Sequence, residues 1–196
     1  MKKLLFAAIA VLGLTNVNAQ EENVTTGGFE QGDLYVSGTV GYNSSSKGDV
    51  DSNALTFSPT AGYFVSDNIA VELGLTIGSG EDTAKTKTSS FGGSLGATYF
   101  FTPANQFSFT LGAGVAYTNS KVNPDGEDND TKWNNLAVAV APGVNYFVSD
   151  SFALRASIGA LSYSSEKADF DGAEADNNFG INLDLSDINF GITYKF

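Results

Sequence analysis

The chain has 196 residues, a formal net charge of −12, and neither cysteine nor histidine. Without cysteine it can form neither a disulfide nor a thiolate metal site. Its acidic balance argues against nucleic-acid binding, which needs clustered Lys and Arg. Gly is abundant, Phe and Tyr together number 23 and Pro is scarce, a balance that favours many strands joined by turns over a disordered acidic chain.

The first 19 residues have the pattern of a secretory signal peptide. Lys2 and Lys3 give a positive start, and residues 4–14 form an apolar run that is too short to cross a bilayer as a helix. Small residues then lead to a predicted cleavage between Ala19 and Gln20. Cleavage leaves 177 residues with a net charge of −14. We therefore predict an exported protein with a short linker at residues 20–32 and one domain at residues 33–196.

Alternation of apolar residues with period two dominates the rest of the chain and predicts eight strands. Each is close to the 9–11 residues that a tilted strand needs to cross a bilayer. The predicted strands cover residues 34–42, 55–65, 69–77, 91–101, 107–117, 136–148, 152–158 and 188–196.

The predicted connections alternate in length. Long polar connections fall at residues 43–53, 78–89, 119–132 and 164–178, and short ones at 66–68, 102–106 and 149–151. The sequence Tyr-Phe-Val-Ser-Asp precedes two of the short turns, at 63–67 and 146–150, and a looser copy starts at Tyr99. Short turns on one side and long loops on the other are typical of outer-membrane barrels, where the long loops face outside.

One irregularity lies near the end of the chain. Apolar residues occupy odd positions from Phe179 to Leu185 but even positions from Ile188 onward. A shift of one residue reverses the two faces of a strand. We therefore expect a bulge or break near Ser186 and Asp187.

The kind of polar residue distinguishes a membrane barrel from a soluble one. A soluble barrel also alternates, but its outer face carries many charged residues. Here the polar face of the first seven strands is mainly Gly, Ser, Thr, Ala and Asn, and its clear charges are Glu72 and Arg155. The four long connections hold 13 of the 22 acidic residues. Small polar residues suit a narrow interior, so we predict an all-β, eight-stranded, antiparallel, up-and-down transmembrane barrel.

Aromatic residues gather at the predicted strand ends, although ordinary core aromatics could also lie there. Two such bands are typical of the two membrane interfaces. The predicted girdle comprises Tyr63, Tyr99, Phe101, Phe107, Tyr146 and Phe152 near the short turns, and Tyr42, Tyr117 and Trp133 near the long loops.

With these features the chain resembles the OmpA/OmpX-type eight-stranded outer-membrane barrels, in the stand-alone form of the outer membrane protein β-barrel domain. The resemblance covers residues 33–196. Its most specific motif is the C-terminal strand with its terminal phenylalanine, which is similar to the signal that this family presents to the outer-membrane assembly machinery. The residues of that motif are Ile188, Phe190, Ile192, Tyr194 and Phe196. The resemblance implies location in the outer membrane, contact with its lipid and periplasmic termini.

Glu72 and Arg155 form the sharpest candidate site. Each lies nine residues after the Tyr of its Tyr-Phe-Val-Ser-Asp turn, so both should lie at the same depth and face inward. Their strands are four apart in an eight-stranded barrel and therefore face each other across a lumen that is just wide enough for side chains. Because an unpaired buried charge is costly, we predict a salt bridge that obstructs the lumen. The alternative is that each side chain bonds separately to Ser, Thr, Asn or water. The family that the chain resembles carries a comparable gate, formed by an acid and an Arg inside the barrel.

Other site chemistry is disfavoured. The acidic segment from Asp125 to Asp130 does not match EF-hand spacing, so a solvated loop is the favoured interpretation over a calcium site, and we predict no metal and no cofactor. Without His or Cys, neither a Ser-His triad nor a thiolate nucleophile is possible, and Glu72 has no clear second acid beside it. We therefore predict that the protein is not an enzyme.

The predicted role is that of a monomeric structural protein of the cell envelope with acidic loops exposed outside. A narrow porin-like channel is the first alternative, since small inward residues leave space that water could fill: Gly92, Gly96, Gly112, Gly114, Ala137, Ala139 and Gly143. A surface-binding module that acts through the long loops is the second alternative. The fold does not choose among these roles.

Overall fold

The structure, a computed structural model, describes residues 27–196 except 48–49, 84, 125–129, 159 and 183–187. The predicted signal peptide, its cleavage site at Ala19 and Gln20, and the predicted break at Ser186 and Asp187 therefore lie outside the described residues. Within the described part, no helix is long and apolar enough to span a membrane.

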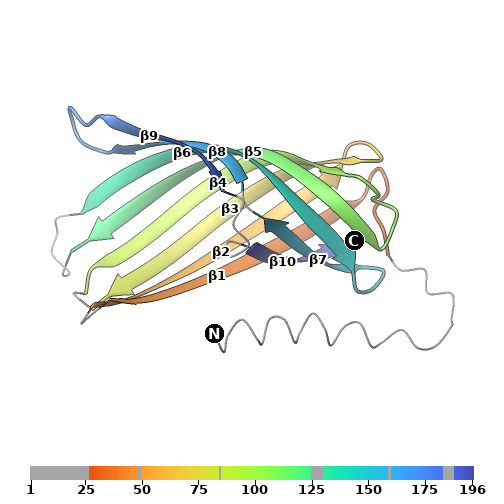
Figure 1. The fold of residues 1–196 in the computed structure, drawn as a ribbon, viewed down its shortest axis with the longest axis horizontal. Coiled ribbons are helices and arrows are strands. Elements are labelled where there is room, and N and C mark those ends of the chain that lie inside the picture. The colour runs from red at the N-terminus through yellow and green to blue at the C-terminus, as the bar shows by residue number, and fades with distance from the viewer. Residues whose placement is uncertain (1–26, 48–49, 84, 125–129, 159, 183–187) are drawn as a thin grey trace.

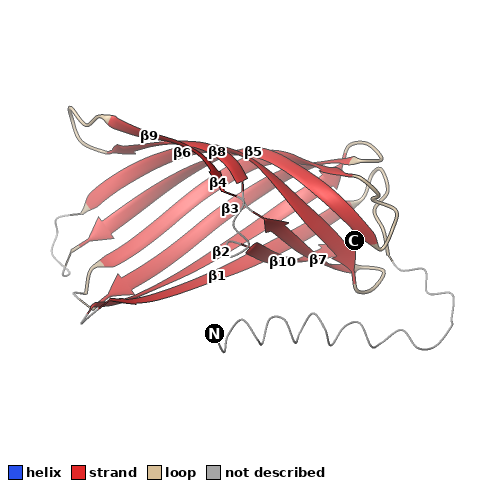
Figure 2. Cartoon of the chain, viewed as in Figure 1, coloured by secondary structure: helices blue, strands red, loops and turns tan. Residues whose placement is uncertain are grey.

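Strands make up nearly all of the described chain (Figures 1 and 2). Ten are present among the described residues: β1 (Leu34–Lys47), β2 (Val50–Phe64), β3 (Ile69–Asp82), β4 (Lys87–Phe100), β5 (Phe107–Asn123), β6 (Thr131–Phe147), β7 (Phe152–Ile158), β8 (Ala160–Ala168), β9 (Ala175–Asn182) and β10 (Ile188–Lys195).

These strands form a closed, antiparallel, eight-stranded barrel. Each of β1 to β6 pairs with its neighbour in sequence, and β10 pairs with both β7 and β1. β7 and β8 both pair with β6 and act as two parts of one strand, as do β9 and β10. Closure depends on a short β1–β10 ladder from Tyr35–Lys195 to Thr39–Gly191, which we call the seam.

The strands are longer than the sequence pattern predicted. β5 and β6 have 17 residues each, and the ladders continue through most of the segments expected to be long loops. The expected loop at residues 164–178 contains the end of β8 and the start of β9. The prediction was wrong because apolar alternation reports only the part of a strand that faces an apolar medium, whereas the hydrogen-bonded ladder continues into water.

The reversal of faces near the C-terminus is matched by one in the preceding strand. Gly143 of β6 pairs with Ser157 of β7, whereas Val140 of β6 pairs with Leu161 of β8. Between these two pairs the β7–β8 segment advances by four residues while β6 advances by three. One extra residue on one of two paired strands is what defines a β-bulge. As a result, even positions face outward in β7 and β10, and odd positions do so in β8 and β9.

Apolar side chains face outward and polar ones inward along the barrel. Leu73, Phe91 and Phe109 of the outer face are 63%, 61% and 61% exposed. The buried apolar residues instead gather at the end of the barrel where the short turns lie, around Phe29, Phe64 and Phe100. An exposed apolar band around a closed sheet is the arrangement that lipid covers.

Candidate functional site

The short turns supply the aromatic side chains that fill one end of the lumen. The two Tyr-Phe-Val-Ser-Asp copies turn with the same hydrogen bonds, because Ser66 Oγ accepts from the Ile69 amide at 3.2 Å and Ser149 Oγ accepts from the Phe152 amide at 3.1 Å. Such Ser bonds to the backbone favour a tight turn. The turns therefore fix the residues just before them in the same orientation.

The second residue of each copy points into the barrel. Phe64 and Phe147 hold this place in the two exact copies and Phe100 holds it in the looser one, and all three are fully buried. The sequence analysis noted the repeat but not its inward phenylalanines. Each of these phenylalanines directly follows an outward tyrosine. Because neighbouring residues of a strand face opposite sides, the sequence alternation could have identified them as inward-facing.

Phe29 completes this aromatic plug from the N-terminal side. Its ring stacks on Phe64 with centroids 4.6 Å apart and meets Phe147 edge-on at 4.9 Å. It also lies 5.4 Å from Phe100 and 5.2 Å from Tyr35. Residues 27–29, which belong to the segment that the sequence analysis expected to be a linker, are thus packed into the barrel mouth, whereas residues 30–32 are exposed.

Backbone and charged contacts hold the N-terminal segment in this position. The Phe29 amide donates to Pro103 O at 2.8 Å, and Lys195 Nζ donates to Gly28 O at 2.6 Å. Lys195 Nζ also lies 3.5 Å from a carboxylate oxygen of Asp33. A side chain at Gly28 would lie 2.4 Å from Ala104 O, so the close approach of the two backbones requires glycine there.

The lumen next to the plug is bridged by the two predicted charged residues. Arg155 Nη1 lies 2.6 Å from Glu72 Oε1, and the two side chains are 19% and 17% exposed. Tyr35 Oη donates to the same Glu72 oxygen at 2.5 Å, and Thr98 Oγ1 donates to the other at 2.8 Å. The structure therefore brings Glu72 and Arg155 together and adds two hydroxyl donors that the sequence analysis did not name.

Small residues on the neighbouring strands make room for this network. Glu72 lies between Gly62 and Gly96 in the ladders, and Arg155 has Gly191 on one side. A Cβ on Gly62 would overlap the Tyr35 ring. The tyrosine can therefore lie across β2 and reach the carboxylate only because residue 62 is glycine.

The Arg155 guanidinium joins the ion pair to the aromatic plug. Its central carbon lies 5.6 Å from the Tyr35 ring centroid and 5.5 Å from that of Phe100. Beyond the pair, a cavity of about 230 Å³ is lined by small polar residues, including Thr39, Thr60 and Ser157. Two obstructions, an aromatic one and an ionic one, thus lie in series in the lumen.

The predicted girdle residues lie on the outer face with one exception. Tyr42, Tyr63, Tyr99, Phe101, Phe107, Tyr117 and Phe152 are exposed and Tyr146 is half-buried, all on the face that carries the apolar band. Trp133 pairs with Ser120 and Ala168, which face inward. Trp133 therefore does not belong to the outward ring, because the parity of β6 places it opposite to Leu136.

The predicted assembly motif forms an outward ridge. Phe190, Ile192, Tyr194 and Phe196 are all exposed, and the Tyr194 and Phe196 rings meet edge-on with centroids 5.1 Å apart. The side chain of Ile188 lies outside the described residues. The ridge is available to lipid or to a partner protein.

The calcium hypothesis cannot be placed, because residues 125–129 are outside the described part. Asp130 is described, and Lys121 and Asn123 bond to its carboxylate. Hydrogen bonding from Lys121 lowers the pKa of Asp130. Elsewhere in the described chain, no cluster of acidic side chains could hold a metal ion.

Several solved outer-membrane barrels share this architecture. The chain is similar to OprG from Pseudomonas aeruginosa (15% identity, TM-score 0.54, covering 89% of this chain and 99% of that one). It is also similar to Neisserial surface protein A (18%, 0.51, 83% and 97%) and to the attachment invasion locus protein Ail of Yersinia pestis (13%, 0.50, 85% and 99%). At these identities the likeness shows the fold alone. Comparison with curated proteins finds no match.

A family comparison agrees with the fold. The family described as outer membrane protein beta-barrel domain matches residues 6–196, which is nearly the whole chain. Together with the closed, apolar-banded barrel, this match shows that the chain belongs to the outer membrane protein β-barrel domain family.

Proposed function

We propose that this protein is a non-conducting structural barrel of the cell envelope, neither a channel nor an enzyme. The observation that carries this proposal is the double obstruction of the lumen. The plug at Phe29 fills the turn end, and the Glu72–Arg155 pair crosses the lumen directly beside it. A solute that entered the 230 Å³ cavity would meet both barriers in turn.

The channel alternative needs a continuous wet path. Small inward residues such as Gly112 and Ala141 do line the cavity beyond the ion pair. Buried rings that pack at 4.6–5.4 Å leave no comparable space at the turn end. The lumen resembles a pocket that is closed at one end, which supports the structural role over the porin-like one.

The orientation and partners of the barrel belong to the same proposal. The short turns and both ends of the barrel domain would face the periplasm, and the strand extensions would face outside. The barrel would act as a monomer, because its outer face is an apolar band suited to lipid. The outward ridge that ends at Phe196 would be the surface recognised by the assembly machinery. The binding-module alternative depends on loop tips, several of which lie outside the described residues.

Planar-bilayer conductance tests the proposal. Wild-type protein, first checked for folding by its heat-dependent gel mobility, should insert and give no steady unitary current. The double variant Phe29→Ala with Glu72→Ala removes one group from each barrier and should show channel openings. The matched control is Phe109→Ala with Glu72→Ala, because Phe109 is a 61% exposed outer-face ring. It should open less often. Steady current through the wild type would overturn the structural role and support the channel.

A further inference from the structure

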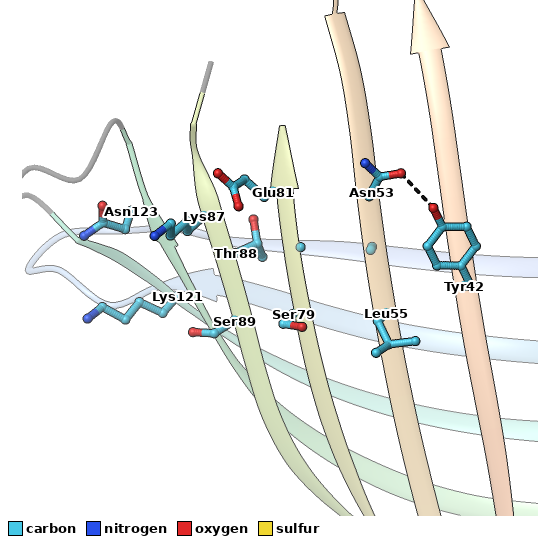
Figure 3. A pocket seen from close by; sticks show the side chains of 12 residues that line it. Tyr42, Asn53, Leu55, Ser79, Glu81, Lys87, Thr88, Ser89, Lys121 and Asn123 are labelled. Atoms are coloured by element: carbon cyan, nitrogen blue, oxygen red, sulfur yellow. Dashed lines mark hydrogen bonds between the residues drawn. The ribbon is translucent and has the colours of Figure 1, made fainter. Parts of the chain in front are cut away.

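The outer face of the barrel has a pocket just beyond the apolar band. It has a volume of about 710 Å³ and is formed by the extended ends of β1 to β5 (Figure 3). Its lining includes Tyr42, Leu55 and Ser89 on outward positions, together with Lys87 and Lys121. Figure 3 shows the two lysines on one side of the pocket and Tyr42 and Leu55 on the other.

One row of paired residues crosses this surface from apolar to basic. Tyr42 pairs with Leu55, Leu55 with Ser79, Ser79 with Ser89, Ser89 with Lys121, and Lys121 with Lys132. All of these side chains share the outer face. Because barrel strands are tilted, such a row climbs relative to the membrane plane. It therefore runs from the apolar band, past two hydroxyl groups, to two amines on the water side.

The lysines stand at a constant distance from the apolar band. Lys87 lies four residues beyond Phe91, Lys121 lies four beyond Tyr117, and Lys132 lies four beyond Leu136. Four residues span about 13 Å along a strand, and tilt reduces the height above the last apolar residue to about 10 Å. The amines at the ends of flexible side chains can then reach the head-group layer of a bilayer.

The three amines of this surface, Lys87, Lys121 and Lys132, share two nearby carboxylates, Glu81 and Asp130. Lys121 bonds to Asp130, yet its side chain remains 43% exposed. Glu81 is the cross-strand partner of Lys87 on the same face, although among the described residues no carboxylate lies within ion-pair distance of Lys87 or Lys132. Lys121 and Lys132 lie directly opposite each other on one face, and the charge of Asp130 acts on both. One carboxylate beside two amines leaves a positive charge that a further anion can offset.

We propose that this row, together with Lys87 two residues from Ser89, binds a phosphate-bearing lipid of the outer leaflet, with its phosphate at Lys87, Lys121 and Lys132 and its acyl chains against Leu55 and Tyr42. The gradient along the row matches an amphiphile, whereas free phosphate would have no use for its apolar end. The inference rests on the proposed orientation, with the strand extensions outside, but not on the closed lumen.

The test compares lipids retained by the folded protein. Wild type and variants are reconstituted in phosphatidylcholine nanodiscs that contain a minor fraction of diphosphorylated lipid A, or of an uncharged diglucosyl lipid as a second arm. Lipids that stay bound on release are counted by native mass spectrometry. Lys87→Gln and Lys132→Gln are the test variants, since neither breaks a described ion pair. Lys85→Gln is the matched control, because it removes the same charge two residues from Lys87 and outside the pocket.

Wild type and Lys85→Gln should retain lipid A in preference to the glucosyl lipid. Lys87→Gln and Lys132→Gln should each lower that retention about fivefold, the factor equal to about 1 kcal/mol per basic residue at a lipid surface. Equal retention by all four proteins would overturn the site, as would an equal loss in Lys85→Gln, which would indicate only bulk charge. Loss of the preference in excess inorganic phosphate would reassign the row to free phosphate. Conductance of the same preparations separates any failure here from a failure of the closed-lumen proposal.

Discussion

Removal of Glu72 should destabilise the barrel more than removal of its partner Arg155. Glu72→Ala leaves a guanidinium that is 19% exposed without its carboxylate, and also deprives the Tyr35 and Thr98 hydroxyls of their acceptor. Breaking a buried pair from one side costs about 3–5 kcal/mol. In Arg155→Ala the carboxylate keeps two hydroxyl donors, so its cost should fall at the lower end of that range.

The double variant supplies the decisive comparison. With both side chains gone no buried charge remains, and the cost should be about that of Glu72→Ala alone, far below the sum of the two single costs. The coupling energy should therefore reach about 2–3 kcal/mol. Urea unfolding in phosphatidylcholine vesicles measures each value, with the one tryptophan, Trp133, as the fluorescent reporter. If the single costs simply add, the two side chains do not act as a pair and the reasoning fails.

Three further perturbations address the parts around the pair. Lys195→Met removes the bond to the N-terminal segment, so that segment should be cut faster by protease added on the turn side, with a loss of about 1–3 kcal/mol in unfolding free energy; unchanged cleavage would contradict the anchoring. Gly62→Ala should cost about 1–3 kcal/mol by overpacking, whereas Gly180→Ala, with open space around it, should cost less than half as much in the same urea assay. Lys121→Gln should raise the lowered pKa of Asp130 toward its ordinary value in a carboxyl NMR titration; the wild-type interaction is present at neutral pH and is lost as pH falls through the lowered pKa.

The alternation of the sequence predicted the faces of the barrel well, because lipid on one side and a narrow lumen on the other act on every strand alike. It did not predict how far the strands extend. The polar segments from Ser79 to Asp82 and from Lys87 to Ser90 have no apolar alternation, yet the β3–β4 ladder continues through them. The bulge between β7 and β8 was also missed, because parity alone did not reveal that residues 160–168 form strand until their pairing with β6 was known.

The part of the candidate site that could be predicted from the sequence is the pair of residues whose depth in the barrel could be measured from the same turn motif. Glu72 and Arg155 were aligned by equal distance from the same turn motif, and the structure places them in contact. Phe29 had no such reference. It lies in a segment without periodicity, and its partners Phe64 and Phe147 are far away in sequence, so only the folded barrel brings them together.

The network around Glu72 lies where the barrel depends on few hydrogen bonds for closure. The seam joins β1 to β10 over five residue pairs, and the Thr193 hydroxyl donates to Ser37 Oγ across it at 3.0 Å. Tyr35 belongs to the first of those pairs and reaches over β2 to Glu72 on β3, so the network ties a seam strand to a strand two positions away and, through Arg155, to β7 on the other side of the seam. The network should then stabilise closure as well as fill space. Glu72→Ala should speed amide exchange in the seam more than in the β3–β4 ladder, as measured by mass spectrometry of exchanged peptides. Equal acceleration of both would mean that the network stabilises the barrel as a whole and that the seam is not its weakest part.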